Sequence, residues 1–374
     1  MFIAPEFQQL RDRIAAGGPD AVERALARGR LDLDDLAALL SPAAGPFLAE
    51  MAQRSARLTR QRFGNVIQLY APLYLSSFCI NRCAYCGFSA GNAMPRRVLS
   101  FEEAEAEAMI LHRRGFSHIL LVSGEAPAKA GVEYLEALAL RLRDKFAAIS
   151  IEVQPLETAE YARLFAAGIT AVAIYQETYD QTVYDQVHRA GKKRDFVYRL
   201  ATPERAARAG MREVGIGALL GLSDWRAEGL AMGHHLAYLR KAFWRTGLTV
   251  SFPRIRPAKG EFAPLMPVSE RDLTQLIFAL RIFDPDLGLY LSTREEARYR
   301  DGMLGLGPTR YSAGSCTVPG GYGDSAASGA QFEIGDQRTI DEVSRAIRAK
   351  GLDPVRKDWD AIFQQHEQGR RQAA

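Results

Sequence analysis

Hydrophobic and polar positions follow two different periods along the chain, and the change of period divides it into sections. Over residues 1–64, apolar side chains recur at helical spacing, as in Asp32–Leu40 and Phe47–Arg62. Acidic residues open the first of these two runs, as is typical of the first turn of a helix. Pro42 interrupts the section between them. We therefore expect an N-terminal helical extension over residues 1–64.

From Val66 onward, short apolar runs alternate with longer amphipathic runs, a pattern typical of β-strands and α-helices around a parallel sheet. Ser100 and Glu103 form a capping-box pattern ahead of a predicted helix over Phe101–Arg114. The predicted strands are Val66–Tyr74, His118–Val122, Ile149–Val153, Ala171–Tyr175, Glu213–Ala218, Leu248–Phe252, Gly288–Leu291 and Arg310–Ser312. Eight such units predict an α/β fold, a (β/α)8 TIM-type barrel over residues 65–330. Residues 331–374, which contain Trp359, are expected to form a C-terminal helical extension.

Composition agrees with an ordinary globular protein. The chain has 374 residues, of which 47% are hydrophobic and 25% charged, and its net charge is +4. It contains no run of eighteen apolar residues and no secretory signal at its start, so we expect a cytoplasmic protein without membrane contact. Basic residues form no block and are not interleaved with aromatic residues, which argues against nucleic-acid binding.

Polar residues follow most of the predicted strands. In a barrel of this kind the active site lies where the strands end, so these residues are candidates for chemistry. They are Cys79, Cys83 and Cys86 after the first strand, Ser123–Glu125 after the second, Glu152 and Gln154 around the third, Gln176 and Glu177 after the fourth, Arg254 and Arg256 after the sixth, Arg294 after the seventh, and Ser312–Ser315 after the eighth.

Cys79, Cys83 and Cys86 crowd into eight residues, and in a reducing compartment such crowding indicates metal binding. Three thiolates can hold three irons of a [4Fe-4S] cluster and leave the fourth iron without a protein ligand. A zinc site completed by His112 or His118, or three unrelated buried thiols, would be the alternatives. The fourth cysteine, Cys316, stands alone and is not expected to bind the cluster.

The segment Cys79-Ile-Asn-Arg-Cys83-Ala-Tyr85-Cys86 resembles the signature of the radical S-adenosylmethionine (SAM) superfamily, in which SAM chelates the open iron. Further segments resemble the aromatic amino-acid lyases of that superfamily. They are Pro72–Leu75, Val122–Glu125, Glu152–Pro155, Tyr175–Thr178, Gly191–Phe196, Ser251–Pro257, Leu291–Glu295, Ser312–Ser315, Pro319–Tyr322 and Lys357–Asp360. Together they are most similar to the tyrosine lyases that serve thiamine thiazole biosynthesis.

That resemblance implies a reaction. SAM would be cleaved to methionine and 5′-deoxyadenosine, and L-tyrosine would be split between Cα and Cβ into p-cresol and 2-iminoacetate (dehydroglycine). It also implies a partner thiazole synthase and an electron donor, reduced flavodoxin or ferredoxin. A hydrogenase-maturation tyrosine lyase would need further cysteines, and none follows Cys316. A tryptophan lyase, or an iron-sulfur electron carrier without substrate chemistry, stays as an alternative.

The resemblance also implies residues for SAM. Ser123, Gly124 and Glu125 would meet its ammonium group, and Tyr85 its adenine. Glu177 and Arg199 are candidates for its ribose and carboxylate, because a carboxylate accepts hydroxyl donors and a guanidinium binds a carboxylate through two bonds. A simple turn at Gly124, loop packing of Tyr85 and a surface ion pair of Arg199 are the structural alternatives.

Arg294 is the candidate for the substrate carboxylate. It directly follows a predicted strand, and a carboxylate in a desolvated cavity calls for a cation that can bind both oxygens. Tyr74 and Ser312 could complete the site that binds the amino acid, with packing at the strand ends as the alternative.

Overall fold

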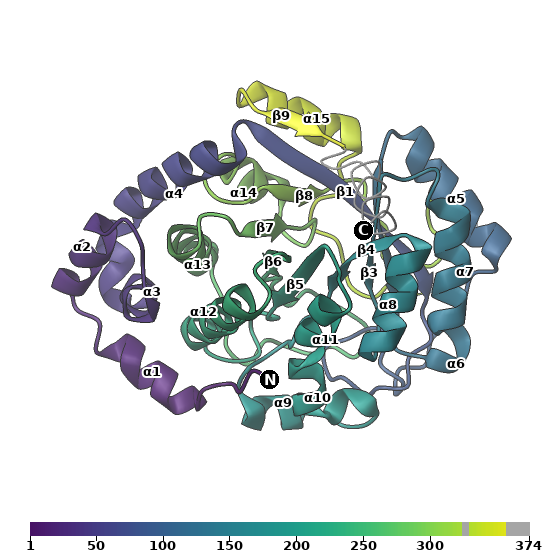
Figure 1. The fold of residues 1–374 in the computed structure, drawn as a ribbon, viewed down its shortest axis with the longest axis horizontal. Helices are drawn as coiled ribbons and strands as arrows, with labels where there is room; N and C mark the ends of the chain where they lie inside the picture. Colours follow the sequence, from purple (N-terminus) through teal and green to yellow (C-terminus); the bar gives the residue numbers. More distant parts are fainter. Residues whose placement is uncertain (324–328, 357–374) are drawn as a thin grey trace, which may run out of the picture.

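The computed structural model describes residues 1–323 and 329–356, and at its centre parallel strands close into a barrel (Figure 1). The strands are β1 (Val66–Ser76), β2 (His118–Ser123), β3 (Ala148–Glu152), β4 (Ile169–Ala173), β5 (Glu213–Gly217), β6 (Gly247–Ser251), β7 (Gly288–Leu291), β8 (Arg310–Ser312) and β9 (Asp353–Val355). Strands β2 to β8 neighbour one another in sequence order, and β1 pairs with both β8 and β2. This closure confirms the predicted (β/α)8 barrel.

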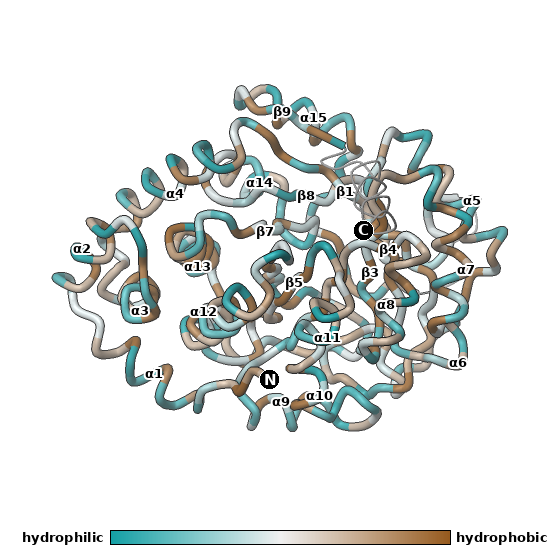
Figure 2. The backbone as a smooth tube through the Cα atoms, in the orientation of Figure 1, coloured by the Kyte–Doolittle hydropathy of each residue, from teal (hydrophilic) through white to brown (hydrophobic). Residues whose placement is uncertain are grey.

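Helices surround the barrel. They are α5 (Phe101–Arg113), α6 (Pro127–Ala130), α7 (Val132–Leu142), α8 (Thr158–Ala167), α9 (Gln181–Val187), η2 (Lys192–Arg194), α10 (Phe196–Leu200), α11 (Thr202–Arg208), α12 (Trp225–Ala242), α13 (Glu270–Phe283) and α14 (Ala297–Gly302). The capping box expected at Ser100 is present, with Ser100 accepting from the Glu103 amide and Glu103 accepting from the Ser100 amide. Figure 2 shows hydrophobic residues concentrated in the central strands and alternating with hydrophilic residues along the outer helices.

The N-terminal section is helical, as its pattern predicts. It forms α1 (Phe7–Ala15), α2 (Pro19–Ala27), α3 (Leu33–Leu40), the 3-10 helix η1 (Pro42–Phe47) and α4 (Leu48–Phe63). These helices lie along the outside of α12 and α13 (Figure 1), and their buried side chains belong to the same hydrophobic core as the barrel. The proposed domain boundaries at residues 64 and 330 stay predictions.

The C-terminal section differs from a purely helical extension. It contains α15 (Ile340–Ala349) and then β9, which pairs in parallel with the start of β1, Val66 opposite Asp353. Trp359 and the Lys357–Asp360 segment lie outside the described residues. None of the described helices is long and apolar enough to span a membrane.

Candidate active site

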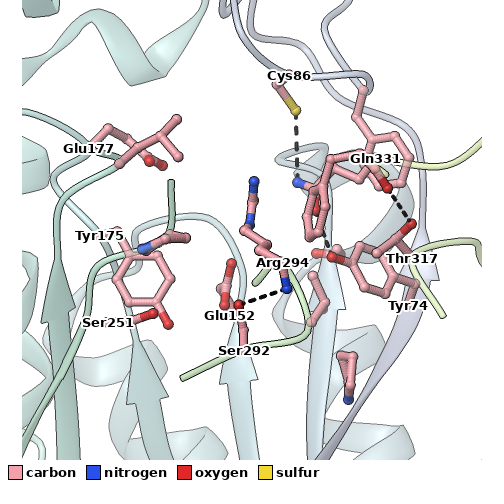
Figure 3. Close-up of a pocket in the computed structure, with 18 of the residues that line it drawn as sticks. Tyr74, Cys86, Glu152, Tyr175, Glu177, Ser251, Ser292, Arg294, Thr317 and Gln331 are labelled. Atoms are coloured by element: carbon pink, nitrogen blue, oxygen red, sulfur yellow. Dashed lines mark hydrogen bonds between the residues drawn. The ribbon is translucent and has the colours of Figure 1, made fainter. Parts of the chain in front are cut away.

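One cavity at the carboxyl ends of the barrel strands brings together the residues that the sequence assigned to the cluster, to SAM or to the amino-acid substrate. They are Tyr74, Cys79, Cys83, Tyr85, Cys86, Ser123, Gly124, Glu125, Glu177, Arg199, Arg294 and Ser312. The parallel strands explain the convergence, since all eight end at the same mouth of the barrel. Figure 3 shows side chains from several strands pointing into this space.

The cysteine loop follows β1 and is fixed by main-chain contacts to its neighbours. The amide of Ile80 donates to the Glu125 carbonyl at 3.0 Å, and the amide of Arg82 donates to the Ala190 carbonyl at 2.9 Å. Cys83 is buried, whereas Cys79 and Cys86 are partly exposed, and all three are free thiols. Burial raises the pKa of each of these thiols, so their thiolate forms call for compensating positive charge.

This donor set fits an iron-sulfur cluster held by three thiolates. Within residues 1–323 and 329–356, no group of three or more His, Cys, Asp or Glu side chains is arranged to hold a single metal ion. His118 is engaged elsewhere, because its Nδ1 lies 3.1 Å from Gln68 Nε2 and its Nε2 lies 2.8 Å from Ser150 Oγ. His112 packs edge-on against Phe146. Neither histidine completes a zinc site with the three thiols.

Glu125 and Arg199 form a buried ion pair beside the loop. Arg199 Nη1 donates to Glu125 Oε1 at 2.7 Å, and Asn81 Nδ2 donates to Glu125 Oε2 at 2.6 Å. Arg199 Nε donates to the Tyr175 carbonyl at 2.6 Å. The side chain of Arg199 is only 6% exposed, so its ion pair is not the surface pair that the sequence left open. The Arg199 guanidinium and the Glu125 carboxylate therefore both line the cavity and are already paired with each other.

Glu177, another residue that lines the cavity, has a backbone conformation that few non-glycine residues adopt. Its φ is +73°, in the left-handed region, and its amide carbonyl accepts from Leu219 at 2.8 Å. Lys193 Nζ donates to Glu177 Oε1 at 2.6 Å, and Arg199 Nη2 lies 3.6 Å from the same oxygen. Lys193 lies in the Gly191–Phe196 signature, but no role for it follows from the sequence.

Tyr85 is held by a hydrogen bond rather than by loop packing alone. Its hydroxyl lies 2.7 Å from His188 Nε2, and His188 Nδ1 lies 2.9 Å from the Tyr184 carbonyl. The carbonyl can only accept, so Nδ1 carries the proton and Nε2 accepts from Tyr85. Burial, followed by the charges of Lys193 and Arg199, lowers the pKa of His188 to about 2 and keeps its ring neutral.

Arg294 extends into the cavity without a carboxylate partner (Figure 3). Its guanidinium carbon lies 3.4 Å from the centre of the Phe332 ring, and no hydrogen bond or ion pair joins the guanidinium to any other described residue. Tyr74 and Ser312 line the same space, but both have protein partners. The Tyr74 hydroxyl donates to Gln331 Oε1 at 2.6 Å, and Ser312 Oγ accepts from the Thr293 amide at 2.9 Å.

Glu152 is a cavity residue for which the sequence analysis predicts no specific role. It ends β3 and lines the space that contains Arg294. Burial, and then the charge of Glu177, raises the pKa of Glu152 to about 7. Of the other strand-end residues, Arg256 also lines the cavity and pairs with Glu296 at 3.3 Å, whereas Arg254 pairs with Glu295 outside it.

The chain matches the models of two known families. Residues 73–231 match the model of the radical SAM superfamily, and residues 251–353 match that of the Biotin and Thiamin Synthesis associated domain.

Two full-length relatives are called 2-iminoacetate synthase. The protein from Escherichia coli (strain K12) is 44% identical, with 96% of this chain and 95% of the relative covered. The one from Salmonella typhimurium (strain LT2) is 45% identical, with 95% of each chain covered.

A solved structure shows the same architecture. It is the FeFe-hydrogenase maturase HydG from Carboxydothermus hydrogenoformans, which is 33% identical with a TM-score of 0.87 and covers 94% of this chain and 84% of that one. The chain described here therefore belongs to the radical SAM superfamily and, within it, to the family of the 2-iminoacetate synthases.

Proposed function

We propose that this protein cleaves the Cα–Cβ bond of L-tyrosine to give 2-iminoacetate and p-cresol, with SAM converted to methionine and 5′-deoxyadenosine, for synthesis of the thiamine thiazole. The protein is a radical SAM enzyme that uses a [4Fe-4S] cluster and SAM. The observation that carries the substrate assignment is Arg294, a cavity guanidinium without a carboxylate partner in the described chain, in the same space as three free thiols. Full-length similarity to two 2-iminoacetate synthases supports the reaction.

In this proposal Cys79, Cys83 and Cys86 hold the cluster and leave one iron open. The chemistry supplied by the bound cluster and cofactor is reductive cleavage of SAM to methionine and a 5′-deoxyadenosyl radical, which removes a hydrogen atom from the substrate. The chain's own task is to orient both molecules and to exclude water. The barrel mouth suits that task, because its charged groups are largely buried and paired.

The paired acids remain able to bind SAM. Each carboxylate has about four acceptor positions, and Glu125 uses two of them on Arg199 and Asn81. We propose that Ser123, Gly124 and Glu125 meet the SAM ammonium group, that Tyr85 meets the adenine, and that Glu177 and Arg199 contact the ribose and carboxylate, or fix the groups that do.

Arg294 then binds the tyrosine α-carboxylate. The face of Phe332 holds the guanidinium plane, so that the two oxygens of a carboxylate can be bound side by side. Ser312 and Tyr74 flank this position in the proposal, with hydroxyl groups ordered by Thr293 and Gln331. An electron carrier that binds no substrate would not need an unpaired cation inside the cavity.

A redox donor is required, and we propose reduced flavodoxin or ferredoxin. Four exposed basic residues surround the outer edge of the cysteine loop, namely Arg82, Arg189, Lys192 and Arg194. Main-chain hydrogen bonds join Arg82 to Ala190 and Arg189 to Arg82, both at 2.9 Å, and none of the four forms an ion pair within the described chain. Such a surface would attract an acidic carrier protein. We also propose thiazole synthase as the recipient of 2-iminoacetate, and a cytoplasmic location, which the free thiols favour.

One anaerobic experiment tests the reaction. Reconstituted protein is incubated with SAM, a reductant and either tyrosine or tryptophan, and p-cresol and 5′-deoxyadenosine are measured by liquid chromatography and mass spectrometry. Tyrosine-dependent p-cresol without carbon monoxide or cyanide would support the proposal. Turnover of tryptophan alone would replace the substrate, and release of carbon monoxide and cyanide would favour the hydrogenase-maturation chemistry.

A further inference from the structure

Five of the seven acidic and basic side chains that line the cavity are matched in ion pairs. Among the cations, Lys193 pairs with Glu177 at 2.6 Å, Arg199 with Glu125 at 2.7 Å, and Arg256 with Glu296 at 3.3 Å. This pairing accounts for every lining Lys and Arg except Arg294, and for every lining acid except Glu152. Within residues 1–323 and 329–356, no hydrogen bond or ion pair reaches the Glu152 carboxylate.

Glu152 and Arg294 come from different strands but face the same space. Glu152 ends β3, Arg294 follows β7, and Figure 3 shows both side chains directed into the cavity between Tyr175 and Tyr74. They do not form an ion pair with each other, although their charges interact across the cavity. A half-buried cation and a half-buried anion that stay unpaired each carry a desolvation penalty. A ligand with both charges would remove both penalties at once.

We propose that Glu152 accepts the α-ammonium group of the amino-acid substrate while Arg294 holds its α-carboxylate, so that the two residues together select a zwitterion. This proposal rests on the proposed function, since it adds the ammonium position to the same substrate site. Free α-amino acids carry an ammonium group and a carboxylate group on the same carbon, Cα, and no other pair of cavity residues in the described chain offers unmatched charges of both signs.

The electrostatics of the cavity agree with this assignment. Burial and the nearby Glu177 raise the pKa of Glu152, and the Arg294 guanidinium opposes that rise. An ammonium group placed against Glu152 would favour its charged form in the same way, because an opposite charge stabilises a carboxylate. Burial lowers the pKa of Arg294, and Tyr74 and Glu152 oppose that shift, so a carboxylate ligand would stabilise the guanidinium.

The competing occupant of Glu152 is the phenol hydroxyl of the substrate, which could donate to a carboxylate. The two assignments differ in which group of the ligand binds Glu152, the ammonium group or the phenol hydroxyl. Three ligands separate them, namely L-tyrosine, tyramine, which lacks the carboxylate, and 3-(4-hydroxyphenyl)propanoate, which lacks the ammonium group. All three keep the phenol.

The experiment measures dissociation constants by calorimetry on anaerobically reconstituted protein with SAM bound and no reductant, so that no turnover occurs. Glu152→Gln should bind tyrosine and tyramine about 10- to 100-fold more weakly, the usual effect of losing one hydrogen bond to a charged group. Its affinity for 3-(4-hydroxyphenyl)propanoate should be unchanged or higher. Arg294→Ala should show the crossed pattern, with the propanoate and tyrosine weakened and tyramine spared.

Glu152→Asp serves as the conservative variant and should recover part of the affinity for tyrosine. Iron content and SAM affinity, measured in every variant, show whether the fold and the cofactor site survive. Undiminished tyrosine affinity in Glu152→Gln would overturn the proposal, and equal weakening of all three ligands would assign Glu152 to the phenol. Wild-type protein that binds no amino acid would overturn it as well.

Failure of the proposed function would look different. If wild-type protein binds tryptophan instead of tyrosine, the substrate is wrong but the pair can still be tested. L-tryptophan, tryptamine and indole-3-propanoate then replace the three phenols, and the same crossed pattern between Glu152→Gln and Arg294→Ala is expected.

Discussion

Gly124 lies directly against the backbone carbonyl of Phe78, so that a Cβ at this position would be 2.3 Å from the Phe78 oxygen and 3.2 Å from Cys79 Cβ. The contact joins the turn after β2 to the start of the cysteine loop. Its amide adds to the connection by donating to the Ser76 carbonyl at 3.0 Å. The absence of a side chain at Gly124 therefore sets how closely the loop approaches the second strand.

Gly124→Ala should displace the cysteine loop. Backbone atoms, which cannot move aside cheaply, occupy the position of the new methyl group, and overpacking of this kind costs roughly 1 to 3 kcal/mol. We expect lower iron content after reconstitution and weaker binding of SAM. Gly91→Ala is the matched control, since a Cβ at Gly91 meets no atom within 4 Å. Equal iron content in the two variants would contradict the prediction.

Replacement of single cysteines should show which of them bind the iron-sulfur cluster and which do not. Wild-type protein should hold about four irons per chain after reconstitution, and reduction should convert the cluster to a paramagnetic state whose spectrum changes when SAM is added. Cys83→Ala should abolish both. Cys316→Ser should keep full iron content, because Cys316 does not line the cavity and its thiol lies 3.9 Å from the Val318 carbonyl. One zinc per chain and no cluster would defeat this assignment.

Most of the barrel could be predicted from the sequence because each buried strand is a short apolar run bounded by polar or turn residues. The sequence pattern predicts the start of β4 at Ala171, two residues too late, because the polar Thr170 interrupts the apolar run. In the structure Gly168 ends α8 in a left-handed conformation, with φ of 113°, and β4 begins at the next residue. Strand β9 was missed because it has only three residues, one of them Pro354, which cannot donate to the sheet.

A charge reversal next to the cluster loop should slow reduction by a protein donor. Arg82→Glu combined with Arg189→Glu replaces two exposed positive charges with negative ones, which opposes association with an acidic carrier. Stopped-flow measurement should show slower reduction by flavodoxin and a weaker dependence on salt, whereas turnover driven by dithionite should be unchanged. Arg30→Glu, at an exposed arginine of the N-terminal section, is the control. Equal rates in both variants would place the docking surface elsewhere.

The pairing of charges inside the cavity could not be predicted from the sequence. Lys193 lies between Lys192 and Arg194, both of which are exposed, and nothing in that run of basic residues shows that only the middle one turns inward to Glu177. Glu152 shares the polar character of several strand ends, and its lack of a cation depends on where Arg199 and Lys193 point. The type of residue at a strand end follows from the sequence, but its partner requires the three-dimensional arrangement.

Glu228 of α12 should make stability depend on pH. Burial, together with Asp180 and Asp224, raises the pKa of Glu228 to about 8, although its bonds from Thr178 and the Tyr179 amide oppose the rise. The folded protein therefore holds this proton more tightly than the unfolded chain, whose glutamate has a pKa of 4.5. The contribution of protonated Glu228 to the stability of the folded protein is complete below about pH 4.5 and is lost as the pH rises through about 8.

Glu228→Gln should remove this loss of stability, because glutamine is neutral at every pH. Its oxygen can accept from the Tyr179 amide, and its NH2 group can donate to the Thr178 hydroxyl. The melting temperature of the variant should exceed that of wild type most at pH 8 to 9, and the difference should shrink toward about pH 5. Thermal unfolding followed by circular dichroism across this range measures it. Glu50→Gln, at an exposed glutamate of α4, should leave the wild-type profile in place. A difference independent of pH would contradict the assigned cause.

Arg294 should decide whether tyrosine is turned over. In Arg294→Ala the tyrosine carboxylate would be buried without a cation, and breaking a buried pair in this way costs roughly 3 to 5 kcal/mol. Formation of p-cresol should therefore fall by more than about 100-fold. Arg294→Lys should recover only part of it, because an ammonium group neither binds both oxygens side by side nor stacks on Phe332 as a flat guanidinium does.

The matched control is Arg256→Ala, which removes a cation from the same cavity. Arg256 already pairs through Nη2 with Glu296 at 3.3 Å, so its loss should leave most p-cresol formation intact. Iron content should survive in both variants, since the cysteines belong to a different loop, and slow formation of 5′-deoxyadenosine without p-cresol should continue in Arg294→Ala. Undiminished p-cresol in Arg294→Ala would remove this residue from substrate binding. An equal loss in both arginine variants would show that the cavity needs positive charge but no specific carboxylate partner.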